Sequence, residues 1–175
     1  MKQAIDKIDK LLEEANRFQK EERYLLNVQN FDNLSNYNKI DQRTDWYFPN
    51  YRIRHSIAKG KNNWDIWTKI NDSQAGLSKK QKIKIKPQDE DDLNKKASFV
   101  LEVISKRPYV NNKELYLEKV RVFKNGKLIK EFYTTETETP RDKDNLKYLL
   151  KLPEVKSIKN IGEKNLRQIV NEGLY

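Results

Sequence analysis

The sequence predicts an α+β fold: an N-terminal amphipathic helix packed on a mainly antiparallel sheet, or partly open barrel, of about six strands. Two changes in the spacing of apolar residues along the sequence predict this fold. Apolar residues near the N-terminus recur every three or four positions, whereas from Tyr51 onward they recur every second position. Beyond Pro140 the pattern becomes helical again and predicts a C-terminal helical hairpin. We therefore expect an α+β domain over residues 1–140 and a helical unit over residues 141–175.

The first predicted element is a helix over residues 3–26. Ile5, Ile8, Leu12 and Ala15 form one apolar stripe that no Gly or Pro interrupts. Such a stripe packs either on the sheet or on the same helix of a second copy, so a homodimer through this helix is the alternative. Residues 29–45 are rich in Asn, Asp, Ser and Gln and predict a loop.

Three predicted strands follow, at residues 51–57, 64–70 and 82–86. In the first, Ile53 and His55 share one face while Arg52 and Arg54 share the other. The Gly-containing segment 59–63 predicts a turn between the first two strands, and a proline follows the third. The lysines of the third strand suit either an edge strand or a phosphate-facing surface.

The remaining predicted strands are more apolar. Residues 98–105 form the most hydrophobic strand and are expected at the centre of the sheet. Residues 116–123 and 128–134 flank Asn125-Gly126, a strong two-residue hairpin signal. Residues 88–96 predict a loop or a short helical turn. Consecutive strands that are joined by short turns indicate an antiparallel sheet.

Positive charge and aromatic rings are concentrated in residues 42–86. This block holds eleven Lys and Arg against three Asp and no Glu, together with all three tryptophans of the chain. Basic side chains pair with phosphates, and flat rings stack on bases. A basic run alone is usually a solvated face, and aromatic residues alone are usually core, so it is their combination that indicates nucleic-acid contact.

Residues 158–169, Ile-Lys-Asn-Ile-Gly-Glu-Lys-Asn-Leu-Arg-Gln-Ile, resemble a helix-hairpin-helix turn. They are similar to the second such hairpin in the C-terminal domain of the bacterial RNA polymerase α subunit, over about 25 residues. The resemblance implies that Gly162, Lys164 and Asn165 approach the DNA backbone in the minor groove. The first hairpin of that domain, with its base-reading arginine, has no counterpart here, so the resemblance implies backbone contact without sequence reading. A helical hairpin that only packs on the sheet is the alternative.

No constellation of residues predicts catalysis, a metal ligand set or a cofactor. The chain has no cysteine and a single histidine, His55, and its five glycines are too scattered to form a phosphate-binding loop. The acidic residues 89–92 are consecutive rather than convergent. The sequence shows neither the apolar run of about 18 residues that a spanning helix needs nor a signal-peptide pattern, so we expect a cytoplasmic protein without membrane contact.

The sequence thus predicts a non-catalytic, sequence-tolerant nucleic-acid-binding accessory protein, with DNA favoured over RNA. The alternative is a phage or mobile-element protein, anti-CRISPR-like or transcription-modulating, that docks on a host nucleic-acid-processing protein. Trp64 is expected in the core and Trp67 on the ligand-facing side. The residues expected to bind nucleic acid are Arg43, Trp46, Arg52, Arg54, Lys59, Lys61, Trp67, Lys82, Lys84, Lys86, Gly162, Lys164 and Asn165.

Overall fold

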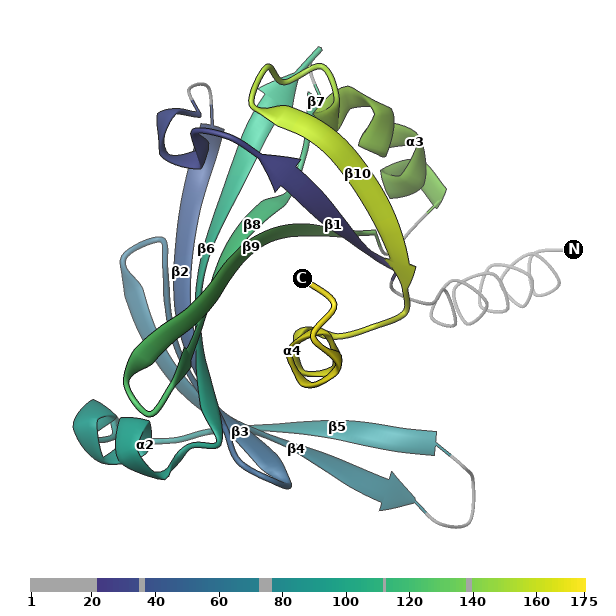
Figure 1. Ribbon diagram of the computed structural model, residues 1–175. Coiled ribbons are helices and arrows are strands. Elements are labelled where there is room, and N and C mark those ends of the chain that lie inside the picture. Colours follow the sequence, from purple (N-terminus) through teal and green to yellow (C-terminus); the bar gives the residue numbers. More distant parts are fainter. Residues whose placement is uncertain (1–21, 35–36, 73–76, 112, 138–139) are drawn as a thin grey trace, which may run out of the picture.

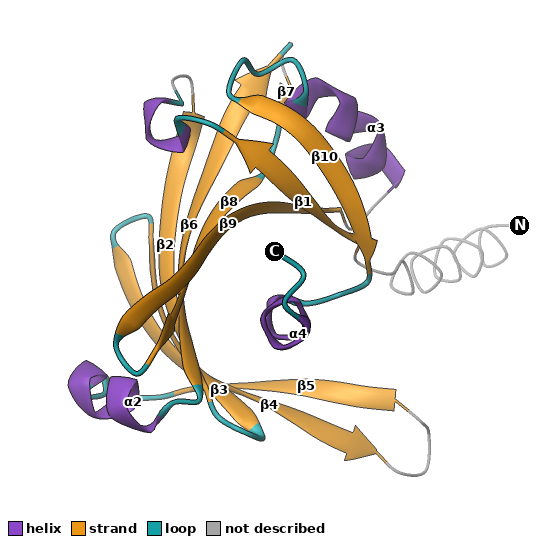
Figure 2. Ribbon diagram, viewed as in Figure 1, coloured by secondary structure: helices purple, strands orange, loops and turns teal. Residues whose placement is uncertain are grey.

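A strongly bent antiparallel sheet dominates the structure, a computed structural model that describes residues 22–34, 37–72, 77–111, 113–137 and 140–175. The strand order is β10-β1-β9-β8-β6-β2-β3-β4-β5, with the short β7 paired to β6. The sheet curves around helix α4, while α3 lies outside the curve (Figures 1 and 2). The strands are β1 Glu22–Val28, β2 Tyr37–Tyr47, β3 Tyr51–Ala58, β4 Lys61–Asp72, β5 Leu77–Lys84, β6 Phe99–Val110, β7 Lys113–Glu114, β8 Leu117–Lys124, β9 Lys127–Thr137 and β10 Val155–Gly162. The helices are the 3-10 helix η1 Phe31–Asn33 and the α-helices α2 Glu90–Lys96, α3 Pro140–Leu149 and α4 Leu166–Glu172.

The predicted α+β class, with an N-terminal helix on a sheet of about six strands, is wrong. Most of the predicted helix 3–26 lies outside the described residues, and its last residues, from Glu22, form β1. Tyr24, Leu26 and Val28 are buried at alternate positions, which is the strand period, and β1 pairs with both β9 and β10. Residues 29–45, predicted as a loop, include most of β2.

The predicted C-terminal helical hairpin is also wrong. Helices α3 and α4 are separated by β10, which pairs antiparallel with β1 from Val28↔Val155 to Arg23↔Gly162. Residues 158–162, expected at the turn of a helix-hairpin-helix, are therefore strand. Residues 141–175 thus contribute an edge strand to the sheet and, through α4, a helix to its concave face. The β-branched residues of this segment favour a strand over a helix.

Local turn chemistry was predicted correctly. Asn125 and Gly126 have φ of 50° and 72° and join β8 to β9, and Lys59 and Gly60 have φ of 50° and 71° and join β3 to β4. Two successive positive φ values match the twist of a two-residue hairpin. The apolar strand β6 lies between β8 and β2 near the middle of the sheet, and β5 is an edge strand.

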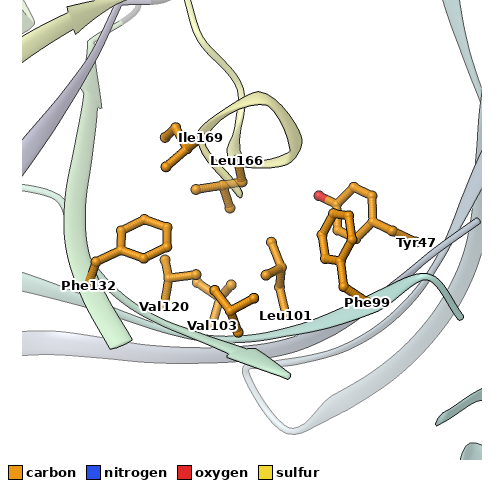
Figure 3. Close-up of a cluster of buried hydrophobic side chains, with 9 residues drawn as sticks. Tyr47, Phe99, Leu101, Val103, Val120, Phe132, Leu166 and Ile169 are labelled. Carbon is orange, nitrogen blue, oxygen red and sulfur yellow. The ribbon is translucent and has the colours of Figure 1, made fainter. Parts of the chain in front are cut away.

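Helix α4 packs into the concave face of the sheet. Leu166 and Ile169 project from the helix onto apolar side chains of four strands (Figure 3). The Tyr47 and Phe99 rings stack there with centroids 4.6 Å apart. The full cluster consists of Tyr47, Phe99, Leu101, Val103, Val120, Val122, Phe132, Leu166 and Ile169. Two further apolar clusters contain Leu149 of α3 and Leu93 of α2.

We predict that Ile169→Ala lowers the free energy of unfolding by about 2–5 kcal/mol, the usual cost of deleting a buried aliphatic side chain. Ile169 is 0% exposed, whereas Leu150, which follows α3, is 52% exposed. The control Leu150→Ala should therefore change stability by no more than about 0.5 kcal/mol. Urea denaturation measures both. If Ile169→Ala changes the free energy of unfolding as little as Leu150→Ala does, α4 is not part of the core.

Candidate nucleic-acid interface

Two rows of residues cross strands β2 to β5 on the concave side of the sheet. Residues directly opposite one another in neighbouring strands share a face, so the register fixes both rows. Five members of these rows, two arginines, two lysines and one tryptophan, come from β3, β4 and β5; we call Arg52, Arg54, Trp67, Lys82 and Lys84 the basic wall. The rows are Tyr47, Arg52, Trp67 and Lys82, and beside it Asp45, Arg54, Asp65 and Lys84.

Trp67 lies on the predicted face, but three cations already surround its ring. The ring centroid lies 5.1 Å from the Arg52 guanidinium carbon, 5.5 Å from that of Arg54 and 5.3 Å from the Lys82 ammonium nitrogen. Cations at such distances are attracted to the face of the indole ring. Trp67 therefore holds cationic groups on the wall, and this arrangement does not offer an uncovered ring for base stacking.

The other two tryptophans lie on the opposite face. Trp46 and Trp64 stack with centroids 5.6 Å apart, and the Trp46 indole N–H donates to Asn94 Oδ1 of α2 at 2.7 Å. Trp46 is 1% exposed, so its expected role in nucleic-acid contact is corrected to a core role. Trp64 is buried, as predicted. His55 stacks on Trp64 at 4.4 Å.

Beside the wall, Asp45 is a carboxylate with 0% exposure that three arginines share. Arg54 donates two hydrogen bonds to it, at 2.6 and 2.8 Å, and Arg43 and Arg52 lie within 3.6 and 3.7 Å. Burial alone would raise the pKa of Asp45, but the hydrogen bonds and charge of Arg54, with the charges of Arg52 and Arg43, lower it below its ordinary value. Asp45 is thus held ionised in the interior.

A second buried carboxylate, Glu118, extends this network across the sheet. It accepts hydrogen bonds from the Tyr116 hydroxyl and from Arg23 at 3.1 Å, and it pairs with Arg43 at 2.7 Å. Arg23 also pairs with Glu136. Burial opposes ionisation of Glu118, but the charges of Arg43 and Arg23 and the Tyr116 hydrogen bond lower its pKa. Burial, followed by the Glu118 charge, raises the pKa of Tyr116 to about 12.

Arg43, predicted to contact nucleic acid, is therefore the link between Asp45 and Glu118. We call the linked groups Arg23, Arg43, Arg52, Arg54, Asp45, Glu118 and Glu136 the ionic network. Its four arginines exceed its three carboxylates, so the network retains a positive charge.

A cavity of about 640 Å³ opens between the ionic network and α4. Its lining includes five arginines, Arg23, Arg43, Arg52, Arg54 and Arg167. Sequence reasoning missed two of them. Arg23 lay within a predicted helix, although the alternation of Tyr24, Leu26 and Val28 would have assigned it to the opposite face of a strand. Arg167 carried no signal, because only the packing of α4 brings it to the cavity.

The remaining predicted residues are spread over three places. Lys59 and Lys61 lie at the exposed β3–β4 turn, and Lys86 follows the end of β5. Gly162 ends β10 with a φ of 75°, where a side chain would strain the backbone. Lys164 forms an ion pair with Glu172 across α4, and Asn165 caps that helix by accepting a hydrogen bond from the Gln168 N–H at 3.0 Å.

The described residues contain neither a metal-ligand group nor a helix that could span a membrane. No group of three or more His, Cys, Asp and Glu residues in that part of the chain is placed to hold a metal ion. None of its helices is both long enough and apolar enough to cross a membrane.

No protein-family model, curated protein or solved structure matches the chain. The basic wall, the ionic network and the cavity are therefore the features of the molecule that bear on its function.

We predict that Asp45→Asn lowers the free energy of unfolding by about 3–5 kcal/mol, because it leaves three arginines without their shared buried carboxylate. Glu102→Gln is the matched control. Glu102 pairs with Arg121 at 2.9 Å, but both side chains are substantially exposed, so the loss should not exceed about 1 kcal/mol. Urea denaturation at neutral pH measures both variants, and equal losses would contradict a structural role for the network.

The same carboxylates predict an acid limit to stability. The folded-state pKa values of Asp45 and Glu118 are lowered, so their contribution is present above the unfolded-state values of about 4 and is lost as pH falls through the folded-state values. The free energy of unfolding should fall as pH decreases from about 5 to about 2. Urea titrations over this range should give a shallower fall for Asp45→Asn, and an unchanged slope would contradict the assignment.

Proposed function

We propose that this chain is a non-catalytic nucleic-acid-binding protein that holds the phosphate backbone against its basic wall. The observation that carries the proposal is the register of β3, β4 and β5, which places Arg52, Arg54, Lys82 and Lys84 together on one face. Neighbouring strands lie about 4.8 Å apart, so these four cations lie close together, and they outnumber the two carboxylates, Asp45 and Asp65, that share their rows. A surface of this kind attracts a polyanion and releases its counterions.

The lysines of this surface are available to a ligand. Lys82 pairs with Asp65 at 3.3 Å but remains largely exposed. Lys84 and the nearby Lys86 are exposed, and neither has an ion-pair partner among the described residues. Since β5 is an edge strand, no further strand among the described residues covers this side.

The arrangement supports phosphate contact more than base recognition. Trp67 is surrounded by cations, and Trp46 and Trp64 are core residues. Contacts to phosphate fix the position of a protein on nucleic acid without reading its sequence. The proposed binding is therefore tolerant of sequence, and it differs from the sequence-based expectation in that base stacking is not required.

We predict that the double variant Lys84→Gln/Lys86→Gln binds oligonucleotides more weakly than wild type and lowers the salt slope by about two units, one for each lost phosphate partner. The matched control is Lys124→Gln/Lys127→Gln, which removes the same charge from the exposed β8–β9 hairpin. Fluorescence anisotropy with single-stranded DNA, duplex DNA and RNA at several salt concentrations measures affinity, and melting temperature reports folding.

Equal losses in the two double variants would show that net charge alone drives binding and would contradict the proposed surface. If no nucleic acid binds wild type at low salt, the proposal is wrong. The hypothesis to test is then docking on a protein partner, because the affinity of a packed protein interface depends less on salt.

A further inference from the structure

Two arginines from distant parts of the chain lie near the same aromatic ring at the cavity. The guanidinium carbon of Arg52, in β3, lies 5.7 Å from the centroid of Tyr47, and that of Arg167, in α4, lies 5.9 Å from the same centroid. Both arginines line the cavity of about 640 Å³. The packing of α4 against Tyr47 brings Arg167 to the ring that Arg52 also approaches.

Arg52 is weakly neutralised. Its nearest carboxylate, Asp45, lies 3.7 Å away and is already bound through two hydrogen bonds by Arg54 and shared with Arg43. Arg52 donates one hydrogen bond to the Tyr47 hydroxyl, at 3.2 Å, while its Nε is buried and has no hydrogen-bond partner within the described part of the chain. An unpaired buried donor of this kind is costly and favours an added acceptor.

Arg167 has no acidic partner among the described residues. Its Nη2 donates to the backbone carbonyl oxygens of Phe48 at 2.9 Å and Pro49 at 2.8 Å. These contacts hold the side chain in place but leave its full charge uncompensated. Two guanidinium groups of like charge thus lie at one cavity, where a bound anion would offset their repulsion.

We propose that this cavity binds a phosphate group between Arg52 and Arg167, and that the phosphate belongs to an unpaired nucleotide of a strand lying on the basic wall. The inference rests on the proposed function and adds a defined subsite to it. Guanidinium groups present paired donors that match phosphate oxygens, and they hold phosphate more specifically than lysine does. The cavity volume lies within the range of small-ligand sites, so a nucleotide-sized group fits.

A first experiment uses inorganic phosphate as the probe. Melting temperatures are compared in phosphate and in chloride at equal ionic strength and pH, for the full chain. Wild type should melt higher in phosphate because a ligand that binds only the folded state stabilises it. Arg52→Gln and Arg167→Gln should lose that difference. Arg121→Gln, which removes an arginine that pairs with Glu102 away from the cavity, should keep it.

A second experiment uses short single-stranded oligonucleotides with and without a 5′-phosphate. Both Arg→Gln variants should bind them on the order of tenfold more weakly than wild type, the usual effect of losing a charge-assisted hydrogen bond. A preference for the 5′-phosphorylated strand would identify a terminal phosphate, and equal affinity would identify an internal phosphodiester. If Arg167→Gln fails to fold, Arg167→Lys keeps the charge and should retain part of the phosphate effect.

The outcomes separate this inference from the proposed function. If wild type gains nothing from phosphate, or if Arg167→Gln binds oligonucleotides as wild type while Lys84→Gln/Lys86→Gln loses affinity, the subsite is wrong and the proposed function stands. If the phosphate effect requires both arginines but no oligonucleotide binds, a site for free phosphate remains, and the nucleic-acid source and the proposed function are both wrong.

Discussion

The concave face of this protein depends on the burial of Asp45 and Glu118 among arginines. Arg43 links the two carboxylates, which belong to strands separated in the sheet by β6. Through Arg54 and Arg23, the linkage reaches β3 on one side and β1 on the other. A buried carboxylate is tolerated only when it is paired and hydrogen-bonded, so these contacts must form together. The ionic network thereby joins the two halves of the bent sheet.

This network also explains where positive charge remains available. Asp45 accepts two hydrogen bonds from Arg54, whereas Arg52 lies 3.7 Å from Asp45 and is only partly neutralised. Arg167 is held by carbonyl oxygens rather than by carboxylates. Arg23, Arg43 and Arg54 are therefore largely neutralised by the buried carboxylates, whereas Arg52, Arg167 and the lysines of β5 are less neutralised.

Local signals in the sequence predicted part of this fold. The Asn125-Gly126 turn and the alternation in β3 depend on backbone preferences within a few residues, so they could be read directly. Strands β1 and β10 could not, because β1 pairs with segments more than 100 residues away. Their local patterns are compatible with either a strand or a helix, so tertiary pairing decides their structure.

The interleaving of rings and cations in residues 42–86 has a structural cause in the alternation of faces along a strand. In a strand, neighbouring side chains point to opposite faces, so Trp46 enters the core while Asp45 next to it joins the ionic network. Charged residues are usually exposed, so the burial of Asp45 could not be predicted from the sequence. Of the predicted site, Arg52, Arg54, Trp67, Lys82 and Lys84 come together on one face, and Trp46 does not join them.

The central claim, that nucleic acid lies on the basic wall, is tested most directly by a lysine-acetylation footprint of the complex with a single-stranded oligonucleotide. Mass spectrometry would compare the modification of each lysine in the free and bound protein. The account predicts strong protection of Lys82, Lys84 and Lys86. It also predicts unchanged reactivity at Lys124, Lys127 and Lys156, which are exposed elsewhere. Uniform protection, or protection confined to Lys124, Lys127 and Lys156, would contradict it.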